Sequence, residues 1–249
     1  MAVEDDQGQG PTARSSSVSR RALFATGATA VLVGAAGAEA VNLVSDGATT
    51  TTSSAPPDVD LMEEHGVLKR VLLIYQEALR RIDIGQEPPV AAIAKSALVV
   101  HDFIEGFHEP LEEGFVFPRL RSAGELVSPV ETLLVQHARG RERTQLILAG
   151  ATNQGMSTTT TRQQVTSAMS DFVRMCEPHE AREDTVVFPA FRAMLRADQL
   201  TDLATTFADL QRQQFGHGAF ATIVNHVAAI ERSLEIYDLN QFTPAPLTA

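Results

Sequence analysis

Histidine and glutamate residues recur at a fixed spacing in two segments of the 249-residue chain. Residues 108–118 and 179–189 share the pattern His-x-x-x-Glu-x-x-x-x-Phe-Pro, with six of eleven positions identical. A spacing of four residues places the imidazole and the carboxylate one turn apart on the same face of a helix. Because mixed nitrogen and oxygen donors suit iron better than calcium or magnesium, the pattern indicates a transition-metal site.

Two further histidines complete a larger repeat. His65 precedes the first segment by nearly the same distance as His137 precedes the second, so a helix with one histidine followed by a helix with His-x-x-x-Glu occurs twice. Apolar residues at alternating steps of three and four accompany each histidine, which predicts that these side chains face a common core. The inward-facing set is His65, His108, Glu112, His137, His179 and Glu183.

Each histidine taken alone could be a core residue with an ordinary hydrogen-bond partner, because histidine is often partly buried. The two glutamates argue against that interpretation for the whole set. Buried carboxylates are costly unless they are paired or bound to metal, and the inward-facing basic residues are limited to Arg141 and Lys69. A pair of metal ions would offset both acidic charges.

The single cysteine and the acidic charge exclude several classes of protein. One cysteine cannot form a disulfide within the chain, nor a Cys-rich zinc or iron–sulfur module. With 31 acidic and 20 basic residues the net charge is −11. The chain therefore repels phosphate backbones, and we expect no nucleic-acid partner.

Helical signals dominate the chain from residue 60 onward, and no segment has the pattern of a strand. The predicted helices cover residues 60–83, 90–120, 129–149, 161–196, 198–210 and 216–236. Short connections between them favour antiparallel neighbours. We therefore expect an all-α protein in which residues 60–236 form an antiparallel four-helix bundle with additional C-terminal helices, followed by a tail over 237–249.

The N-terminal region has the composition of an export signal followed by a linker. Residues 1–40 resemble a twin-arginine signal, with Arg20-Arg21 before an apolar run that ends in Ala38-Glu39-Ala40, a small-x-small cleavage pattern. Residues 41–59 are rich in Ser, Thr and Pro and predict a flexible linker. We expect an exported protein with no membrane span in its mature form, and an uncleaved N-terminal anchor is the alternative.

The paired His-x-x-x-Glu segments and the two solitary histidines resemble the hemerythrin-like family of HHE cation-binding domains. That resemblance covers about residues 60–200 and implies a four-helix bundle with a non-heme diiron centre. It implies that the four histidines are terminal iron ligands and that Glu112 and Glu183 bridge the two irons. Oxygen-carrying hemerythrins have a further histidine four residues after the one that matches His137, whereas this chain has Arg141, which puts simple oxygen carriage in doubt.

Other polar residues near the ligands are candidates for orienting them, a role that metal sites commonly give to outer carboxylates. Glu105 is the first choice among these. The remaining candidates around the ligands are His101, Glu109, Arg141, Cys176 and Glu180. A buried thiol is usually a packing residue, so for Cys176 a core position is the alternative.

Three functions fit these residues. The first is an exported diiron protein that binds oxygen, nitric oxide or iron itself as a sensor, store or scavenger. The second is a diiron oxidoreductase acting on peroxide, oxygen or nitric oxide, which would need an electron source and a protein partner that the sequence does not identify. The third is a bundle in which another metal, such as zinc, has only a structural role.

Overall fold

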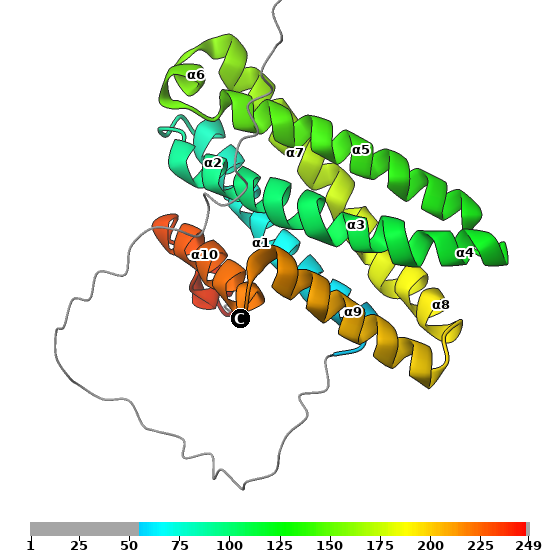
Figure 1. The fold of residues 1–249 in the computed structure, drawn as a ribbon. Coiled ribbons are helices and arrows are strands. Elements are labelled where there is room, and N and C mark those ends of the chain that lie inside the picture. Colours follow the sequence, from blue (N-terminus) through cyan, green and yellow to red (C-terminus); the bar gives the residue numbers. More distant parts are fainter. Residues whose placement is uncertain (1–54, 248–249) are drawn as a thin grey trace, which may run out of the picture. The chain divides into compact units, whose positions relative to one another are not determined.

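The computed structural model describes residues 55–247, and within that range it contains helices and no strand. Four long helical rods form an antiparallel bundle (Figure 1). The rods are made of α1 (Pro57–Asp83); α2 (Val90–Val99), η1 (Val100–His108), α3 (Glu109–Leu111), η2 (Glu112–Val116) and α4 (Phe117–Ala123); α5 (Val127–Gly150); and α7 (Thr159–Arg182), η3 (Glu183–Val187) and α8 (Phe188–Ala193). The predicted fold class is confirmed.

Each rod packs on two others. Helix α1 contacts α2 and α7, and α5 contacts the same two elements from the opposite side. Fully buried side chains from all four rods, including Tyr75, Phe103, Ile147 and Met169, fill the space between them. The bundle therefore has a closed apolar interior into which each rod can direct polar side chains.

The helix boundaries differ from the predicted ones by a few residues. Helix α1 begins at Pro57 rather than at residue 60, because proline is well suited to the first helical position, where its missing N–H leaves no bond unmade. A short helix, α6 (Asn153–Ser157), lies in the predicted break after α5. It begins after Thr152, whose hydroxyl oxygen accepts a hydrogen bond of 2.9 Å from the Gly155 N–H.

Wide π-helical turns interrupt the second and fourth rods at η1, η2 and η3. At the end of η2 the Phe117 N–H bonds to the Glu112 carbonyl, and at the end of η3 the Phe188 N–H bonds to the Glu183 carbonyl. A proline follows Phe117 and Phe188 directly and cannot donate to the helix. The repeated Glu-x-x-x-x-Phe-Pro pattern thus coincides with a π-turn, a feature often found at functional sites.

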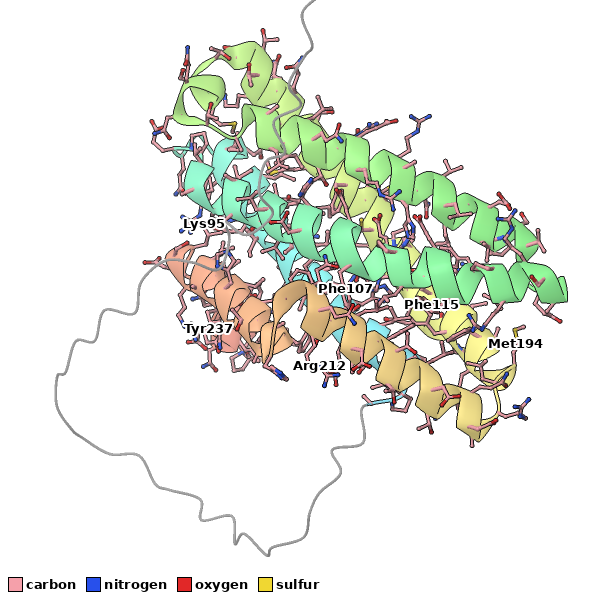
Figure 2. All side chains as sticks on the ribbon, viewed as in Figure 1. Lys95, Phe107, Phe115, Met194, Arg212 and Tyr237 are labelled. Atoms are coloured by element: carbon pink, nitrogen blue, oxygen red, sulfur yellow. The ribbon has the colours of Figure 1, made fainter. Side chains whose placement is uncertain are left out.

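Two C-terminal helices, α9 (Ala197–Phe215) and α10 (Ala219–Ser233), extend the bundle over α1 and α2. Phe107 and Phe115, labelled in Figure 2, lie on the second rod where it faces α9, with ring centroids 5.5 Å from Phe215 and 5.3 Å from Phe207, respectively. Pro110, four residues after Gly106, has no N–H to donate to the Gly106 carbonyl. This carbonyl accepts a 3.0 Å hydrogen bond from Gln214 Nε2 of α9.

An ion pair fastens α10 to the first rod. Two of the three guanidinium nitrogens of Arg70, Nε and Nη2, donate to the buried carboxylate of Glu231, at 2.9 and 2.5 Å. Beyond α10 the chain makes one 3₁₀ turn, η4 (Leu239–Phe242), within the predicted tail.

The predicted export signal, 1–40, and residues 41–54 of the predicted linker lie outside the described residues. Among the helices in residues 55–247, none combines the length and the apolar character that crossing a membrane would require.

Candidate metal centre

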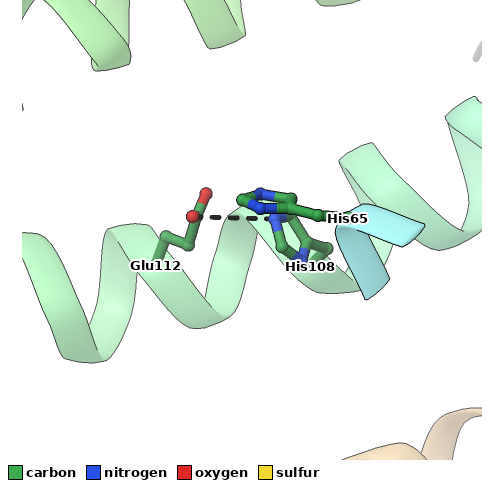
Figure 3. A group of neighbouring side chains, drawn as sticks. All are labelled: His65, His108 and Glu112. Atoms are coloured by element: carbon green, nitrogen blue, oxygen red, sulfur yellow. Dashed lines mark ion pairs between the residues drawn. The ribbon is translucent and has the colours of Figure 1, made fainter. Parts of the chain in front are cut away.

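The structure brings all six predicted ligand residues together inside the bundle. His65 comes from α1, His108 is the last residue of η1, and Glu112 is the first residue of η2 (Figure 3). The other three, from α5, α7 and η3, are His137, His179 and Glu183. All six side chains are buried, and the two glutamates have no exposed surface at all.

The six residues form two groups of three. Half-site A consists of His65, His108 and Glu112, and half-site B consists of His137, His179 and Glu183. Within each group the possible ligand atoms all lie within 4.8 Å of one another. Each half-site can therefore hold a metal ion between two imidazoles and a carboxylate.

The glutamates face both half-sites. The two oxygens of Glu112 lie 3.6 Å from His108 Nε2 in half-site A and 3.3 Å from His137 Nε2 in half-site B. Glu183 Oε2 lies 3.0 Å from His179 Nε2 and 3.4 Å from His65 Nε2. Each carboxylate thus touches one histidine of each half-site, as a bridging ligand between two ions would.

The outer nitrogen, Nδ1, of every ligand histidine is held by a side chain from a neighbouring rod. The four pairs are His65 with Asp184 at 2.7 Å, His108 with Glu64 at 2.8 Å, His137 with Glu113 at 2.9 Å and His179 with Gln136 at 2.9 Å. These bonds fix the ring orientation and leave Nε2 directed at the centre, as is usual for metal-binding histidines.

These four orienting residues follow the sequence repeat, although the sequence analysis did not identify them. The residue before each solitary histidine, Glu64 or Gln136, holds the histidine of a His-x-x-x-Glu segment. The residue after each buried glutamate of the centre, Glu113 or Asp184, holds a solitary histidine. The signal that could have revealed them is a polar residue in both halves of the repeat, directly before the solitary histidine and directly after the glutamate.

The chemistry of the donors fits metal ions. None of the four carboxylate oxygens of Glu112 and Glu183 receives a well-aligned hydrogen bond, and His137 Nε2 also makes none. Buried polar atoms of this kind are rare unless something binds them. Two cations at the centre would satisfy these atoms and offset both negative charges.

Without metal, the carboxylates favour protons on the imidazoles. Burial lowers the pKa of His65, but the hydrogen bond with Asp184 and the nearby carboxylate of Glu183 outweigh it and raise the pKa to about 10. His137 behaves like His65: burial lowers its pKa, but the nearby carboxylates of Glu112 and Glu113 outweigh this and raise the pKa to about 10. For Glu183, burial raises the pKa, but the imidazoles of His179 and His65 bring it below its usual value. The centre therefore attracts positive charge.

A third group of side chains that could hold a metal ion consists of Glu109, Glu113 and His137. The guanidinium of Arg141 already pairs with both glutamates of this group. Arg141 Nη2 lies 2.5 Å from Glu109 Oε2 and 2.7 Å from Glu113 Oε1. The predicted role of Arg141 near the ligands is thus a contact with Glu113, which in turn holds His137. Lys69, at the matching position of the first half of the repeat, makes the weaker equivalent contact, 3.5 Å from Glu180.

Two of the predicted orienting residues are not hydrogen-bonded to a ligand Nδ1 atom. Glu105 is half-buried and forms none of the hydrogen bonds to ligand Nδ1 atoms, because these atoms point away from the centre to residues on neighbouring rods. Instead it lies beside Thr144; burial raises the pKa of Glu105, and the Thr144 hydroxyl counteracts this. His101 is exposed and bonds to its neighbour Asp102 at 2.8 Å.

A cavity lies beside the four imidazoles. Its other walls come from Leu68, Ile104, Glu109, Gln136, Gly140, Phe172, Met175 and Cys176. Cys176 is buried in this wall, and burial raises the pKa of its thiol, so the neutral thiol contributes an apolar surface. The mainly apolar walls can admit a small uncharged molecule to the centre.

The chain belongs to the hemerythrin HHE cation-binding domain family. The family pattern matches residues 57–160, which include His65, His108, Glu112 and His137. Curated relatives include uncharacterized proteins of Mycobacterium bovis and of two Mycobacterium tuberculosis strains, each 47% identical over 186 residues, or 75% of this chain and 73% of the relative. No solved structure matches the chain. The predicted family is confirmed, and metal binding is consistent with the two half-sites.

Proposed function

We propose that the chain is an exported non-heme diiron protein that binds a small diatomic molecule, oxygen or nitric oxide, as a sensor, store or scavenger. The observation that carries this proposal is that Glu112 and Glu183 each contact both half-sites from a fully buried position. Half-site A would hold one iron and half-site B the other. Iron bound there supplies a redox-active centre that can take up a diatomic ligand.

The protein's own residues support this function in three ways. The four Nδ1 hydrogen bonds hold the imidazoles in place. The buried position of the ligands keeps bulk water away. The apolar cavity beside the imidazoles offers space for a molecule of a few atoms. Arg141, at the position of the further histidine in oxygen-carrying hemerythrins, is bonded to Glu113. Among the described residues, the cavity is therefore lined by four imidazoles and is not filled by a fifth.

Metal analysis and spectroscopy test the proposal. The full chain, purified without oxygen, should contain about two irons, and its absorption spectrum should change on addition of oxygen or nitric oxide and return when the gas is removed. Sustained consumption of added peroxide would instead favour the oxidoreductase alternative. One zinc per chain and no iron would contradict both and leave a structural metal.

Export is supported by the Arg20-Arg21 pattern and the apolar run that follows it. Fractionation of bacteria that produce the full chain tests this part. The wild-type protein should appear outside the cytoplasm, and the variant Arg20→Lys/Arg21→Lys should stay inside. Equal distribution of the two proteins would contradict twin-arginine export.

A further inference from the structure

The two half-sites differ in the charge of the groups behind their imidazoles. In half-site A both histidines bond to carboxylates, those of Asp184 and Glu64. In half-site B, His137 bonds to the carboxylate of Glu113, but His179 bonds to the neutral amide of Gln136. The geometry is otherwise repeated, with all four distances between 2.7 and 2.9 Å.

The difference is concentrated at two equivalent positions. Glu64 and Gln136 occupy matching places in the two halves of the repeat, each directly before a solitary histidine. Glu64 is buried at 2% exposure, and His108 is its one ion-pair partner among the described residues. Gln136 occupies the same place in the other half without a charge.

A second difference acts in the same direction. In half-site B the Glu113 carboxylate divides its charge between His137 and the guanidinium of Arg141, which lies 2.7 Å away. The matching lysine of half-site A, Lys69, pairs with Glu180, and in residues 55–247 Asp184 forms an ion pair with His65 alone. The imidazoles of half-site A are therefore backed by two undivided negative charges.

A carboxylate that accepts the Nδ1 proton strengthens the opposite nitrogen, Nε2, as a donor to metal, more than a neutral amide does. The extra negative charge also attracts a cation directly, and the attraction is strong where water is excluded. Both effects favour binding in half-site A. The ligand atoms themselves are of the same types in both halves, so the groups behind them must decide the order.

We propose that the centre takes up its two divalent ions in sequence, half-site A first and half-site B second, and that Glu64 and Gln136 set this order. The inference rests on the proposed two-ion function. Changes in the groups that orient metal ligands alter affinity by about 10- to 100-fold. We therefore expect the two dissociation constants of the wild-type protein to differ by about that factor.

Calorimetric titration of the metal-free full chain with Fe(II), without oxygen, measures both steps. Two ions should bind per chain, with separable affinities. The isosteric variants Glu64→Gln and Gln136→Glu should each bring the two constants closer together. The double variant exchanges the two side chains. Its two dissociation constants should differ again, but half-site B should now bind its ion first.

Histidine variants assign each step to a half-site. In the wild-type background, His65→Ala should abolish the tight step, whereas His137→Ala should keep it and lose the weak one. In the Glu64→Gln/Gln136→Glu background these results should be reversed. Circular dichroism of each metal-free variant checks folding, and the single isosteric variants test the inference if a histidine variant is unfolded.

The outcomes separate this inference from the proposed function. Two ions with equal affinities, or an affinity ratio unchanged by both isosteric variants, would overturn the sequential order while leaving the two-ion centre intact. Binding of a single ion per chain would overturn the two-ion centre itself.

Discussion

At the scale of single residues, Glu112 contacts both half-sites and should therefore matter more for metal retention than any single histidine. Its two oxygens face His108 and His137, which belong to different half-sites. Glu112→Ala should therefore lower the iron content at both half-sites, to well under one ion per chain. Metal analysis checks this, with His217→Ala as the control, because His217 is exposed on the connection between α9 and α10. Equal iron loss in the two variants would contradict the assignment of the ligands.

Asp60 gives a prediction for pH dependence. Its half-buried position and the charges of Glu64, Glu63 and Asp58 raise the pKa of its carboxyl from 3.8 to about 7. Between about pH 4 and pH 7 the folded chain holds a proton that the unfolded chain has released. Folding is therefore favoured at the acidic end of this range, and that contribution is lost as the pH rises to 7.

The variant Asp60→Asn should remove this dependence. Its midpoint of urea unfolding should fall less between pH 5 and pH 8 than that of the wild-type protein, at equal metal content. Asp83→Asn, an exposed change on the same helix, is the control and should follow the wild-type curve. A parallel pH dependence in Asp60→Asn and the wild type would show that another group is responsible.

At the scale of elements, the approach of α5 to α7 determines the width of the cavity. A side chain at Gly140 would begin 3.4 Å from Met175 Cε and 3.5 Å from a ring carbon of Phe172. The equivalent position in the first half of the repeat is Leu68, which already lines the cavity from the other side. The glycine therefore keeps one side of the cavity open.

Gly140→Leu should fill this space, because its Cβ would already be in van der Waals contact with Met175 and Phe172, and the rest of the side chain would occupy the cavity that Gly140 lines. We expect the absorption change on mixing with nitric oxide in a stopped-flow instrument to slow by tenfold or more, with unchanged iron content. Overpacking should cost about 1–3 kcal/mol of stability. Gly66→Leu is the matched control, since a Cβ there meets, among the described residues, no atom within 4 Å apart from its chain neighbours and the backbone of its own helix. An unchanged rate would mean that ligands enter by another route.

The sequence predicted the rods and the ligands because both depend on local spacing. His65 and Leu68 share an inward face through helical periodicity alone, and the nearly constant offset between the two halves of the repeat places equivalent residues together. The residues that hold Nδ1 could not be predicted in the same way, because their partners lie on other rods. The π-turns at Glu112 and Glu183 were not predicted either, because amphipathic periodicity does not show where a helix changes from bonds four residues apart to bonds five residues apart.

At the scale of the whole molecule, the candidate metal centre draws its residues from all four rods. Half-site A takes its residues from the first and second rods, half-site B from the third and fourth, and each glutamate crosses between the two. In the metal-free chain the two buried carboxylates depend on protons held by the facing imidazoles, such as those of His65 and His137, and both partners of each pair still lose their hydration on burial. Metal binding should therefore stabilise the complete bundle rather than one helix.

Metal removal tests this connection. A ligand that binds only the folded chain, at a free concentration of about 1,000 times its dissociation constant, contributes about 4 kcal/mol. In a domain of this size that corresponds to a shift of roughly 10 °C in the melting temperature. Chelation should lower the melting temperature by at least this amount, and re-addition of Fe(II) without oxygen should restore it. The variant Glu112→Ala/Glu183→Ala, in which the shared ligands are absent, should show no shift with chelator or iron. If fully chelated wild-type protein melts at the temperature of the loaded protein, the ions do not hold the rods together, and the buried carboxylates must be neutralised by protons on the facing imidazoles instead.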